Sequence, residues 1–553
     1  MIETQPLNAR RTVDAVIVGA GFAGLYAIYS LTRLGLKVQA FEAGQDVGGT
    51  WYWNRYPGAR CDVESEEYSY SFSDELDREW RWSARYAEQP EIHAYLRHVA
   101  DRFDLRRHIG FETRVVSQVW DETRGIWTVT TNDGAQIEAR FCVMASGNLT
   151  VPNYPDIPGL DQFGGTIYHS ARWPQDAADF TGKRVALFGT GSTGIQIAPK
   201  VAAQAAHLYV FQRTPNFSIP AGPLGKLEAA TAVPAHERRR KARATPFGLS
   251  NAVLSQQSAL DATEAEREIK FETVWKSGGS QPFLATFRDL LTDIQANHTA
   301  ADFVRRKIGQ MVKDPATVQM LSSQDYPIGT KRPCVDTDYF ATFNRPNVSL
   351  VDLRKTPIER ITPTGIRTEG AELQVDALIF ATGFDAITGA LRNIAIQGRD
   401  MSLTEKWQDG PSTYLGLMTA GFPNLFIITG PGSPGVKSNM VCSIEHNVDW
   451  IADCISWMNR NAVSHIEPTA EAEQDWGRQV SEVAHRTLFP LADTWYNGAN
   501  IPGKPRVFMP YVGGLHNYIA ACDEIAAADY QGFVKAYATG EQSPERSQFA
   551  GLT

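Results

Sequence analysis

The stretch VDAVIVGAGFAGLYAIYSLTRLGLKVQAFEA, residues 13–43, places three glycines at the spacing Gly-x-Gly-x-x-Gly between an apolar run and a helical pattern. The stretch predicts a strand over residues 13–18, a tight turn, a helix and a second strand. In such a unit the first glycine makes the turn, the second lets a pyrophosphate approach the backbone, and the third lets the helix pack closely on the strand. These glycines are Gly19, Gly21 and Gly24.

The residue that ends the second strand decides which nucleotide this unit fits. That residue is Glu42. Its carboxylate can accept hydrogen bonds from ribose hydroxyls, but it would repel a 2′-phosphate. The phosphates of the nucleotide would lie at the helix N-terminus, where free N–H groups favour anions. We therefore expect this unit to bind FAD or NAD and not NADP.

A second unit, KRVALFGTGSTGIQIAPKVAAQAAHLYVFQRTP at residues 183–215, repeats the pattern with a different ending. Its second strand, predicted over residues 207–211, runs into Arg213, and an arginine there accommodates a 2′-phosphate. One such glycine pattern alone could be a helix-packing turn. Two patterns with opposite chemistry on their second strands predict FAD and NADPH as cofactors. The glycines of this unit are Gly189, Gly191 and Gly194.

Composition limits the function classes. The chain has 553 residues, enough for two or three domains. Its net charge of −9 argues against a nucleic-acid partner, because phosphate backbones need a basic surface. The uncharged run at residues 15–32 contains the first glycine pattern, so we interpret it as a buried strand and helix and expect no membrane span. The six cysteines are scattered without a C-x-x-C or metal-like cluster, so we expect no metal site and a cytoplasmic location. No feature indicates an oligomeric state.

Further segments extend the pattern to two domains of an α/β fold. FCVMASGN at residues 141–148 and VDALIFATGFD at residues 375–385 each predict an apolar strand that runs into small residues, although a plain strand end would look the same. Between residues 220 and 326, apolar residues at helical spacing predict a helical insertion. We therefore predict two Rossmann-like dinucleotide-binding domains in discontinuous segments: 1–148 and 385–553 for FAD, 149–219 and 327–384 for NADP, with 220–326 as the insertion.

The segment FGGTIYHSARWP, residues 163–174, lies on the predicted link between the two domains. It resembles, without a mismatch, the fingerprint of the type I Baeyer-Villiger monooxygenases. Related N-oxygenating flavin monooxygenases carry a similar motif that lacks the Trp-Pro ending. Alternatively, the histidine and tryptophan of this segment only pack the link in place. The fingerprint residues are Phe163, Gly165, His169, Trp173 and Pro174.

The resemblance extends over residues 14–534 and is strongest to the phenylacetone and steroid monooxygenase branch of that family. Stretches that carry it include VGGTWYWNRYPGARCDVES at residues 47–65, GTKRP at 329–333 and WYNGANIPGKPRVFMPY at 495–511. It implies a flavin-dependent enzyme that converts ketones to esters or lactones with NADPH and O2 through a C4a-peroxyflavin. In such enzymes the cofactor carries the organic steps, while the protein supplies a fixed positive charge and excludes water.

By motif position Arg332 is the expected catalytic cation. An arginine suits that role because it keeps its proton and presents several donors in a rigid fork. The resemblance assigns Asp62 to holding Arg332, although this acid could instead only form a turn. Pro333 favours an extended conformation at Arg332, so Lys331 and Arg332 should point to opposite sides. Together with Arg213, Lys331 would then face the NADP 2′-phosphate, while Arg332 faces the flavin. Without the motif, a Lys-Arg pair would be a solvated loop.

Two loops complete the expected site. Trp495 matches a loop tryptophan that in relatives reaches the nicotinamide cofactor, and its turn-rich surroundings fit a gate. A surface loop anchored by one tryptophan is the alternative. The Gly/Pro-rich segment at residues 430–440 corresponds to a pocket-lining loop, where relatives have an apolar residue near Lys437; a lysine there either turns outward or alters the pocket mouth. The expected pocket residues are Pro434, Gly435, Val436, Lys437 and Met440, and further cofactor contacts are expected from Thr50, Trp51, Thr193, Gln196 and Thr214.

Two alternative functions stay open. N- or S-oxygenating flavin monooxygenases use the same peroxide in its protonated form, and the product formed from a ketone without nitrogen or sulfur separates the two reactions. The other alternative is a nucleotide-binding redox sensor without turnover. The intact glycine loops, together with Arg332 and Asp62, argue against that class.

Overall fold

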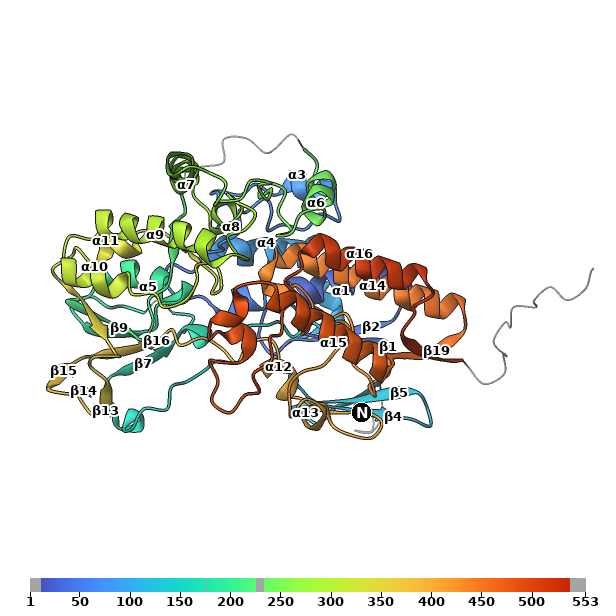
Figure 1. The fold of residues 1–553 in the computed structure, drawn as a ribbon. Coiled ribbons are helices and arrows are strands. Elements are labelled where there is room, and N and C mark those ends of the chain that lie inside the picture. The colour runs from blue at the N-terminus through green and yellow to red at the C-terminus, as the bar shows by residue number, and fades with distance from the viewer. Residues whose placement is uncertain (1–10, 177, 225–232, 538–553) are drawn as a thin grey trace, which may run out of the picture.

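The computed structural model describes residues 11–176, 178–224 and 233–537 as two strand layers with helices packed around them (Figure 1). The first sheet holds β1 in its interior, between the parallel neighbours β2 and β6, while β4, β5 and β6 form an antiparallel meander. Residues 1–10, 177, 225–232 and 538–553, which fall in the predicted domain segments, lie outside the described residues. The strands of the first sheet are β1 (Arg11–Val18), β2 (Val38–Phe41), β3 (Ile109–Gly110), β4 (Val115–Asp121), β5 (Ile126–Thr131), β6 (Gln136–Met144), β17 (Ala395–Gln397) and β18 (Leu425–Ile427).

The second sheet is parallel throughout and has the strand order β12-β9-β8-β16-β7. Three of its strands precede the insertion and two follow it, so both predicted NADP segments contribute. The first sheet likewise combines N-terminal strands with β17 and β18, which follow the second sheet in the chain. The predicted α/β fold of two dinucleotide-binding domains in discontinuous segments is confirmed. The strands of the second sheet are β7 (Thr166–His169), β8 (Arg184–Phe188), β9 (His207–Gln212), β12 (Val348–Asp352) and β16 (Ala377–Phe380).

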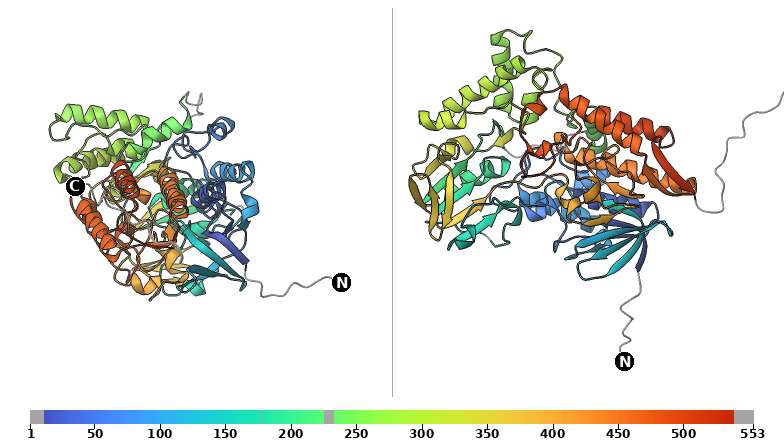
Figure 2. Two further views of the ribbon diagram at one scale, coloured as in Figure 1. Left: turned by 90° about the vertical axis from the view of Figure 1, so that its right-hand side faces the viewer. Right: turned by 60° about the horizontal axis from the view of Figure 1, so that its bottom comes forward.

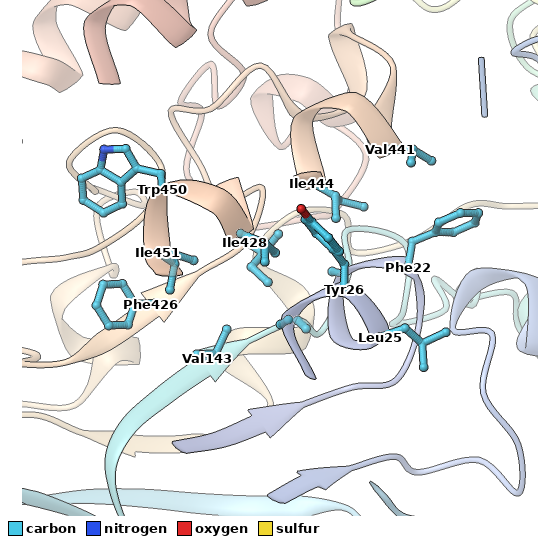
Figure 3. Packing of buried hydrophobic residues seen from close by; sticks show 14 of the residues in the cluster. Phe22, Leu25, Tyr26, Val143, Phe426, Ile428, Val441, Ile444, Trp450 and Ile451 are labelled. Atoms are coloured by element: carbon cyan, nitrogen blue, oxygen red, sulfur yellow. The ribbon is translucent and has the colours of Figure 1, made fainter. Parts of the chain in front are cut away.

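The C-terminal helices, for which the sequence indicates no packing partner, cover the first domain. α14 (Met440–Arg460) packs against α1 (Phe22–Arg33), and α16 (Leu515–Ala527) packs on α14. Figure 3 shows Leu25 of α1 and Ile444 of α14 among the side chains of one buried cluster. In the right-hand view of Figure 2 the orange and red C-terminal helices lie against the blue N-terminal domain. This packing explains why a segment near the end of the chain belongs to the first domain.

The helical insertion is not a single unit. Its helices α7, α8 and α9 share a buried cluster with α5 and the second sheet, whereas α6 packs against α3, α14 and α16 of the first domain. Figure 1 shows α6 beside α3 and apart from α9 and α10. The insertion therefore contacts both domains. These helices are α3 (Asp74–Glu79), α5 (Ser192–Ala202), α6 (Ala235–Arg243), α7 (Glu264–Ser277), α8 (Ser280–Leu284), α9 (Ile294–Met311) and α10 (Pro315–Leu321).

A small antiparallel sheet of β13, β14 and β15 has no counterpart in the predicted elements. None of the helices in the described ranges is long and apolar enough to cross a membrane. Within the same ranges no three His, Cys, Asp or Glu side chains gather as a metal site would need, and all six cysteines are buried thiols. The remaining elements are α2 (Thr50–Trp53), α4 (Gln89–Arg102), β10 (Ser218–Pro220), β11 (Cys334–Asp336), α11 (Tyr339–Thr342), β13 (Ile358–Thr362), β14 (Gly365–Thr368), β15 (Ala371–Gln374), α12 (Gly389–Arg392), α13 (Leu403–Lys406), β19 (Val463–Pro468), α15 (Ala470–His485) and β20 (Phe533–Tyr537), with short 3₁₀ turns between them.

A buried ion pair joins α6 to the first domain. Arg239 Nε lies 2.7 Å from Glu445 Oε2 of α14, and the two side chains are only 7% and 1% exposed. Glu445 also accepts hydrogen bonds from the N–H and the hydroxyl of Ser71, while Arg239 donates to the carbonyl of Ser69. Removing one partner of such a pair leaves an uncompensated buried charge, which costs about 3–5 kcal/mol.

Replacing Arg239 by methionine should therefore lower the free energy of unfolding by about 3–5 kcal/mol, because Glu445 loses its cation. Arg240→Met changes an exposed arginine of the same helix and should shift stability by less than about 0.5 kcal/mol. Urea unfolding followed by tryptophan fluorescence measures both variants. If Arg239→Met and the unmutated protein unfold at the same urea concentration, this ion pair does not hold α6 on the first domain.

Candidate active site

A cavity of about 1270 Å³ is lined by residues of both domains, including both glycine-rich turns. Pockets for one small molecule usually measure about 300–1,000 Å³. Gly19 and Gly21 line the cavity from the first domain, and Gly189 and Gly191 line it from the second. Each glycine-rich turn therefore forms part of the cavity wall, so a ligand in the cavity could contact either turn.

Both turns fit the phosphates of a dinucleotide. α1 and α5 begin directly after Gly21 and Gly191, with no side chain capping either helix, so their first N–H groups are free for an anion. A Cβ on Gly191 would meet no atom within 4 Å, which leaves space where a pyrophosphate would approach. Gly24 and Gly194 do not line the cavity. A Cβ on either would lie 1.9 Å from the carbonyl oxygen of the first glycine in its turn, so these two permit close helix packing.

Glu42 lies directly after β2 and is buried. Its Oε2 accepts a hydrogen bond from the N–H of Ala20 at 2.9 Å, and its Oε1 accepts one from the N–H of Gly44 at 2.8 Å. Burial raises the pKa of this carboxyl, and the two N–H donors act against that rise. Glu42, Thr50 and Trp51 line the cavity. Three residues expected to bind cofactor in the first domain thus border one space.

Several cations gather where the second strand of the NADP unit ends. Arg213, Thr214 and Lys331 line the cavity. Arg354, which is not among the predicted residues, has its Nη2 3.3 Å from Thr214 Oγ1 and 3.1 Å from Asp325 Oδ2. It follows β12, which pairs in parallel with β9, so both arginines lie at the carboxyl edge of one sheet. Burial lowers the pKa of Lys331, and the charges of Arg213 and Arg354 lower it further.

Arg332 and Asp62 form a two-pronged ion pair in the cavity wall. Arg332 Nε and Nη2 donate to the two Asp62 oxygens at 2.5 and 2.7 Å, and Nη1 donates to the carbonyl of Val436 at 2.8 Å. Burial alone would lower the pKa of Arg332, but the Asp62 carboxylate more than offsets burial, so this pKa lies above its usual range. The guanidinium is therefore a permanent cation in a fixed orientation. The Lys331 side chain has a different neighbour, since its Nζ lies 4.6 Å from the centroid of the Tyr326 ring.

Gln196 of α5 connects the second domain to the segment that carries Asp62. Its Oε1 accepts a hydrogen bond from the Tyr56 hydroxyl at 2.9 Å, and its Nε2 donates to the carbonyl of Arg60 at 3.0 Å. Gln196 and Thr193 both line the cavity. The helix that follows the second glycine turn thus contacts the segment whose carboxylate orients the arginine.

Trp495 lines the cavity from a short 3₁₀ turn, η6 (Trp495–Asn497). Thr494 caps this turn, since its hydroxyl accepts a hydrogen bond from the N–H of Tyr496 at 3.1 Å. The Trp495 ring is partly buried against a cluster that includes Phe384. The turn is therefore shaped by its own cap while its tryptophan borders the cavity.

The predicted substrate loop only partly lines the cavity. Val436 and Met440 do so, together with Ser438. In contrast to the prediction, Pro434, Gly435 and Lys437 are absent from the cavity wall. The first two are buried at the start of the 3₁₀ turn η4 (Gly435–Lys437), and the partly buried Lys437 side chain lies against two aromatic rings.

The fingerprint residues lie outside the cavity wall. His169 ends β7, an edge strand of the second sheet; its Nδ1 accepts a hydrogen bond from the N–H of Ala171 at 3.1 Å, and its Nε2 lies 3.4 Å from the carbonyl oxygen of Asn153. Burial lowers the pKa of His169, so these contacts fit a neutral ring with its proton on Nε2. Trp173 is buried and stacks on Tyr168 with ring centroids 5.1 Å apart. These contacts favour the interpretation that the motif packs the link. Of the other fingerprint residues, Phe163 and Gly165 precede β7 and Pro174 follows it.

Arg172, within the fingerprint segment, does line the cavity, although the sequence analysis does not single it out. Its Cζ lies 4.7 Å from the centroid of the Trp53 ring, and its Nη2 donates to the carbonyl of Thr150 at 3.5 Å. It is the only Lys, Arg, Asp or Glu in residues 163–174. A single charged residue in an otherwise uncharged motif is the sequence feature that could have identified Arg172.

Comparison with known proteins places the chain among flavoenzymes. Residues 12–220 match the family described as flavin-binding monooxygenase-like. The chain is 43% identical to phenazine N-monooxygenase PhzNO1 of Lysobacter antibioticus, over 95% of this chain and 98% of that protein. It is 42% identical to a Baeyer-Villiger monooxygenase of Pseudooceanicola batsensis, over 94% of this chain and 96% of that protein. Its fold matches an oxidised steroid monooxygenase bound to NADP with a TM-score of 0.91 at 50% identity, over 95% of this chain and 100% of that one.

The two relatives and the steroid monooxygenase structure each match 94–95% of the chain. They agree with the resemblance that the fingerprint and its neighbouring motifs indicate, including the similarity to steroid monooxygenase. The chain therefore belongs to the Baeyer-Villiger monooxygenases of the flavin-binding monooxygenase-like family, FAD- and NADPH-dependent enzymes that convert ketones to esters or lactones.

Proposed function

We propose that this chain oxidises a ketone to an ester or lactone with NADPH and O2, and that Arg332 is its catalytic cation. One observation carries the proposal. The Arg332 guanidinium, held by both oxygens of Asp62, lies in the wall of a cavity that both glycine-rich turns also line. A fixed positive charge in that position can stabilise negative charge that develops on oxygen during the reaction.

When bound, FAD supplies the oxygen chemistry, since it accepts a hydride from NADPH and reacts with O2. The residues of the chain bind, orient and shield. The free N–H groups after Gly21 and Gly191 would hold the two pyrophosphates. Glu42 would accept hydrogen bonds from a ribose, because a carboxylate has more acceptor sites than the two that backbone N–H groups occupy. Trp51 and Trp495 would narrow the cavity against water.

Asp62 and Val436 restrict Arg332 from two sides. The carboxylate fixes the plane of the guanidinium and offsets part of its charge, and the Val436 carbonyl takes a third N–H. Val436 also lines the cavity and is part of the loop predicted to bind the ketone. The same contacts therefore position both Arg332 and the part of the cavity wall that Val436 forms.

Selection of NADPH over NADH would come from the cations beside Thr214. Arg213 and Lys331 would face a 2′-phosphate, and Arg354 adds a third cation within reach of the Thr214 hydroxyl. Arginine pairs well with phosphate because its donors form a planar fork. NADH lacks the phosphate and would gain nothing from this cluster.

N-oxygenation is a second candidate function, favoured by the 43% identity to a phenazine N-monooxygenase. The 42% identity to a Baeyer-Villiger monooxygenase is nearly equal, so the identities to these two relatives alone do not separate the reactions. The complete Trp173-Pro174 ending favours ketone oxidation. Ester formed from a ketone without nitrogen or sulfur supports the first function; an N-oxide from phenazine with no ester from a panel of ketones supports the second. The six buried thiols are compatible with a reducing cytoplasm, where we place the enzyme.

Arg332→Ala should lower ester formation by about 10²–10³-fold, because the charge that stabilises developing anionic oxygen is gone. FAD should stay bound, since the glycine turn and Glu42 are untouched. Gas chromatography of the ester, set against NADPH consumed and flavin content, measures the effect.

The matched control for this variant is Arg360→Ala, an exposed arginine of the second domain that donates to Gln162. It should leave ester formation unchanged. Asp62→Asn keeps the shape of the acid without its charge and should slow flavin reduction or the oxygen step. A near-normal ester yield from Arg332→Ala with full flavin content would remove Arg332 from catalysis.

Arg213→Ala should weaken NADPH use by about tenfold or more in kcat/KM and leave NADH use nearly unchanged, because only NADPH carries the phosphate that Arg213 would bind. Steady-state oxidation of each nucleotide at fixed ketone measures the ratio. Arg360→Ala again serves as the control. Equal losses for NADPH and NADH would refute the phosphate role of Arg213.

A further inference from the structure

Lys437 is a partly buried amine that the proposed reaction does not use. It ends η4, one residue after Val436, whose carbonyl holds Arg332. Its Nζ lies 4.0 Å from the centroid of the Phe489 ring and 4.7 Å from that of the Tyr496 ring. No acid among the described residues forms an ion pair with it. Burial lowers the pKa of Lys437 and the charge of Arg332 lowers it further, while the attraction of the two ring faces favours the protonated amine and opposes both effects.

The two rings belong to one segment, residues 489–497. Phe489 begins the 3₁₀ turn η5 (Phe489–Leu491), and Tyr496 lies in η6 next to Trp495. Both rings are almost fully buried, at 4% and 0% exposure, so their faces can attract a cation with little competition from water. Between the two rings in sequence, the residues that line the cavity are Asp493, Thr494 and Trp495.

An unpaired ammonium at this place is unfavourable, and an apolar side chain of similar length would avoid that penalty. The ammonium adds one thing that an apolar chain lacks, a directed attraction to two ring faces at once. Because Lys437 and Val436 are neighbours in the chain, this attraction acts on the turn that orients Arg332.

We propose that Lys437 is a positioning residue, whose ammonium fastens the segment 489–497 to the turn that holds Arg332. The tryptophan that borders the cavity and the catalytic cation are then placed together. The inference rests on the proposed role of Arg332. Lys437 touches no reacting group; it acts through Val436 on one side and through Phe489 and Tyr496 on the other.

Lys437→Met tests this role, because methionine has a similar length and no charge. In the FAD-loaded variant, amide hydrogen exchange in residues 489–497 should become about tenfold faster. The share of consumed NADPH that yields ester should fall, and the midpoint of thermal unfolding should stay the same or rise, since an unpaired ammonium is gone. Lys437→Arg keeps a cation for the rings and should restore both the exchange rate and the ester yield.

Lys535→Met is the matched control, since its Nζ lies 5.6 Å from the Trp457 ring and is not in the cavity wall. It should change neither readout. Unchanged exchange in Lys437→Met would overturn the proposal, as would faster exchange with a normal ester yield, or a loss that Lys437→Arg does not restore. If Arg332→Ala keeps its ester yield while Lys437→Met loosens residues 489–497, the fastening contact stands and the role of Arg332 falls.

Discussion

The paired contact between Asp62 and Arg332 joins two segments that lie 270 positions apart in the chain, and the site depends on it. Asp62 belongs to the segment that α5 contacts through Gln196. Arg332 lies just before β11, after the helical insertion. The third contact of the guanidinium, to Val436, brings in the turn before α14. One cation thus connects the two nucleotide domains and the predicted substrate wall. An arginine can do this because it carries several donors in one plane and keeps its charge.

Three partly or fully buried cations, Arg239, Arg332 and Lys437, have different partners. The kind of partner differs with the position of each cation in the fold. Arg239 is paired with Glu445, and neither residue lines the cavity. Arg332 is paired as well, but it borders the cavity, so its charge is available to a ligand. Lys437 has aromatic rings in place of an acid. An acid beside Lys437 would compete with Asp62 for Arg332, whereas rings attract a cation without introducing a negative charge.

Local spacing accounts for what could be predicted from the sequence. The two glycine turns, Glu42 and Arg213 are each defined by their position within one strand-turn-helix unit. A single contiguous stretch of sequence is therefore enough to predict each of them. The remaining features depend on tertiary contacts. Arg354 approaches Thr214 only because β12 pairs with β9 across the insertion. The direction of the Lys437 side chain is set by rings about 50 residues later in the chain. The insertion is divided between the two domains because the apolar faces of its helices pack against different partners.

A crystal structure of the enzyme with FAD and NADP⁺ bound tests the central claim most directly, through the position of the Arg332 guanidinium relative to the isoalloxazine ring. The account predicts contact between the two, at about 3.5–4 Å, with the guanidinium still paired to Asp62. A guanidinium separated from the ring by other protein atoms, in every state of the loaded enzyme, would contradict it.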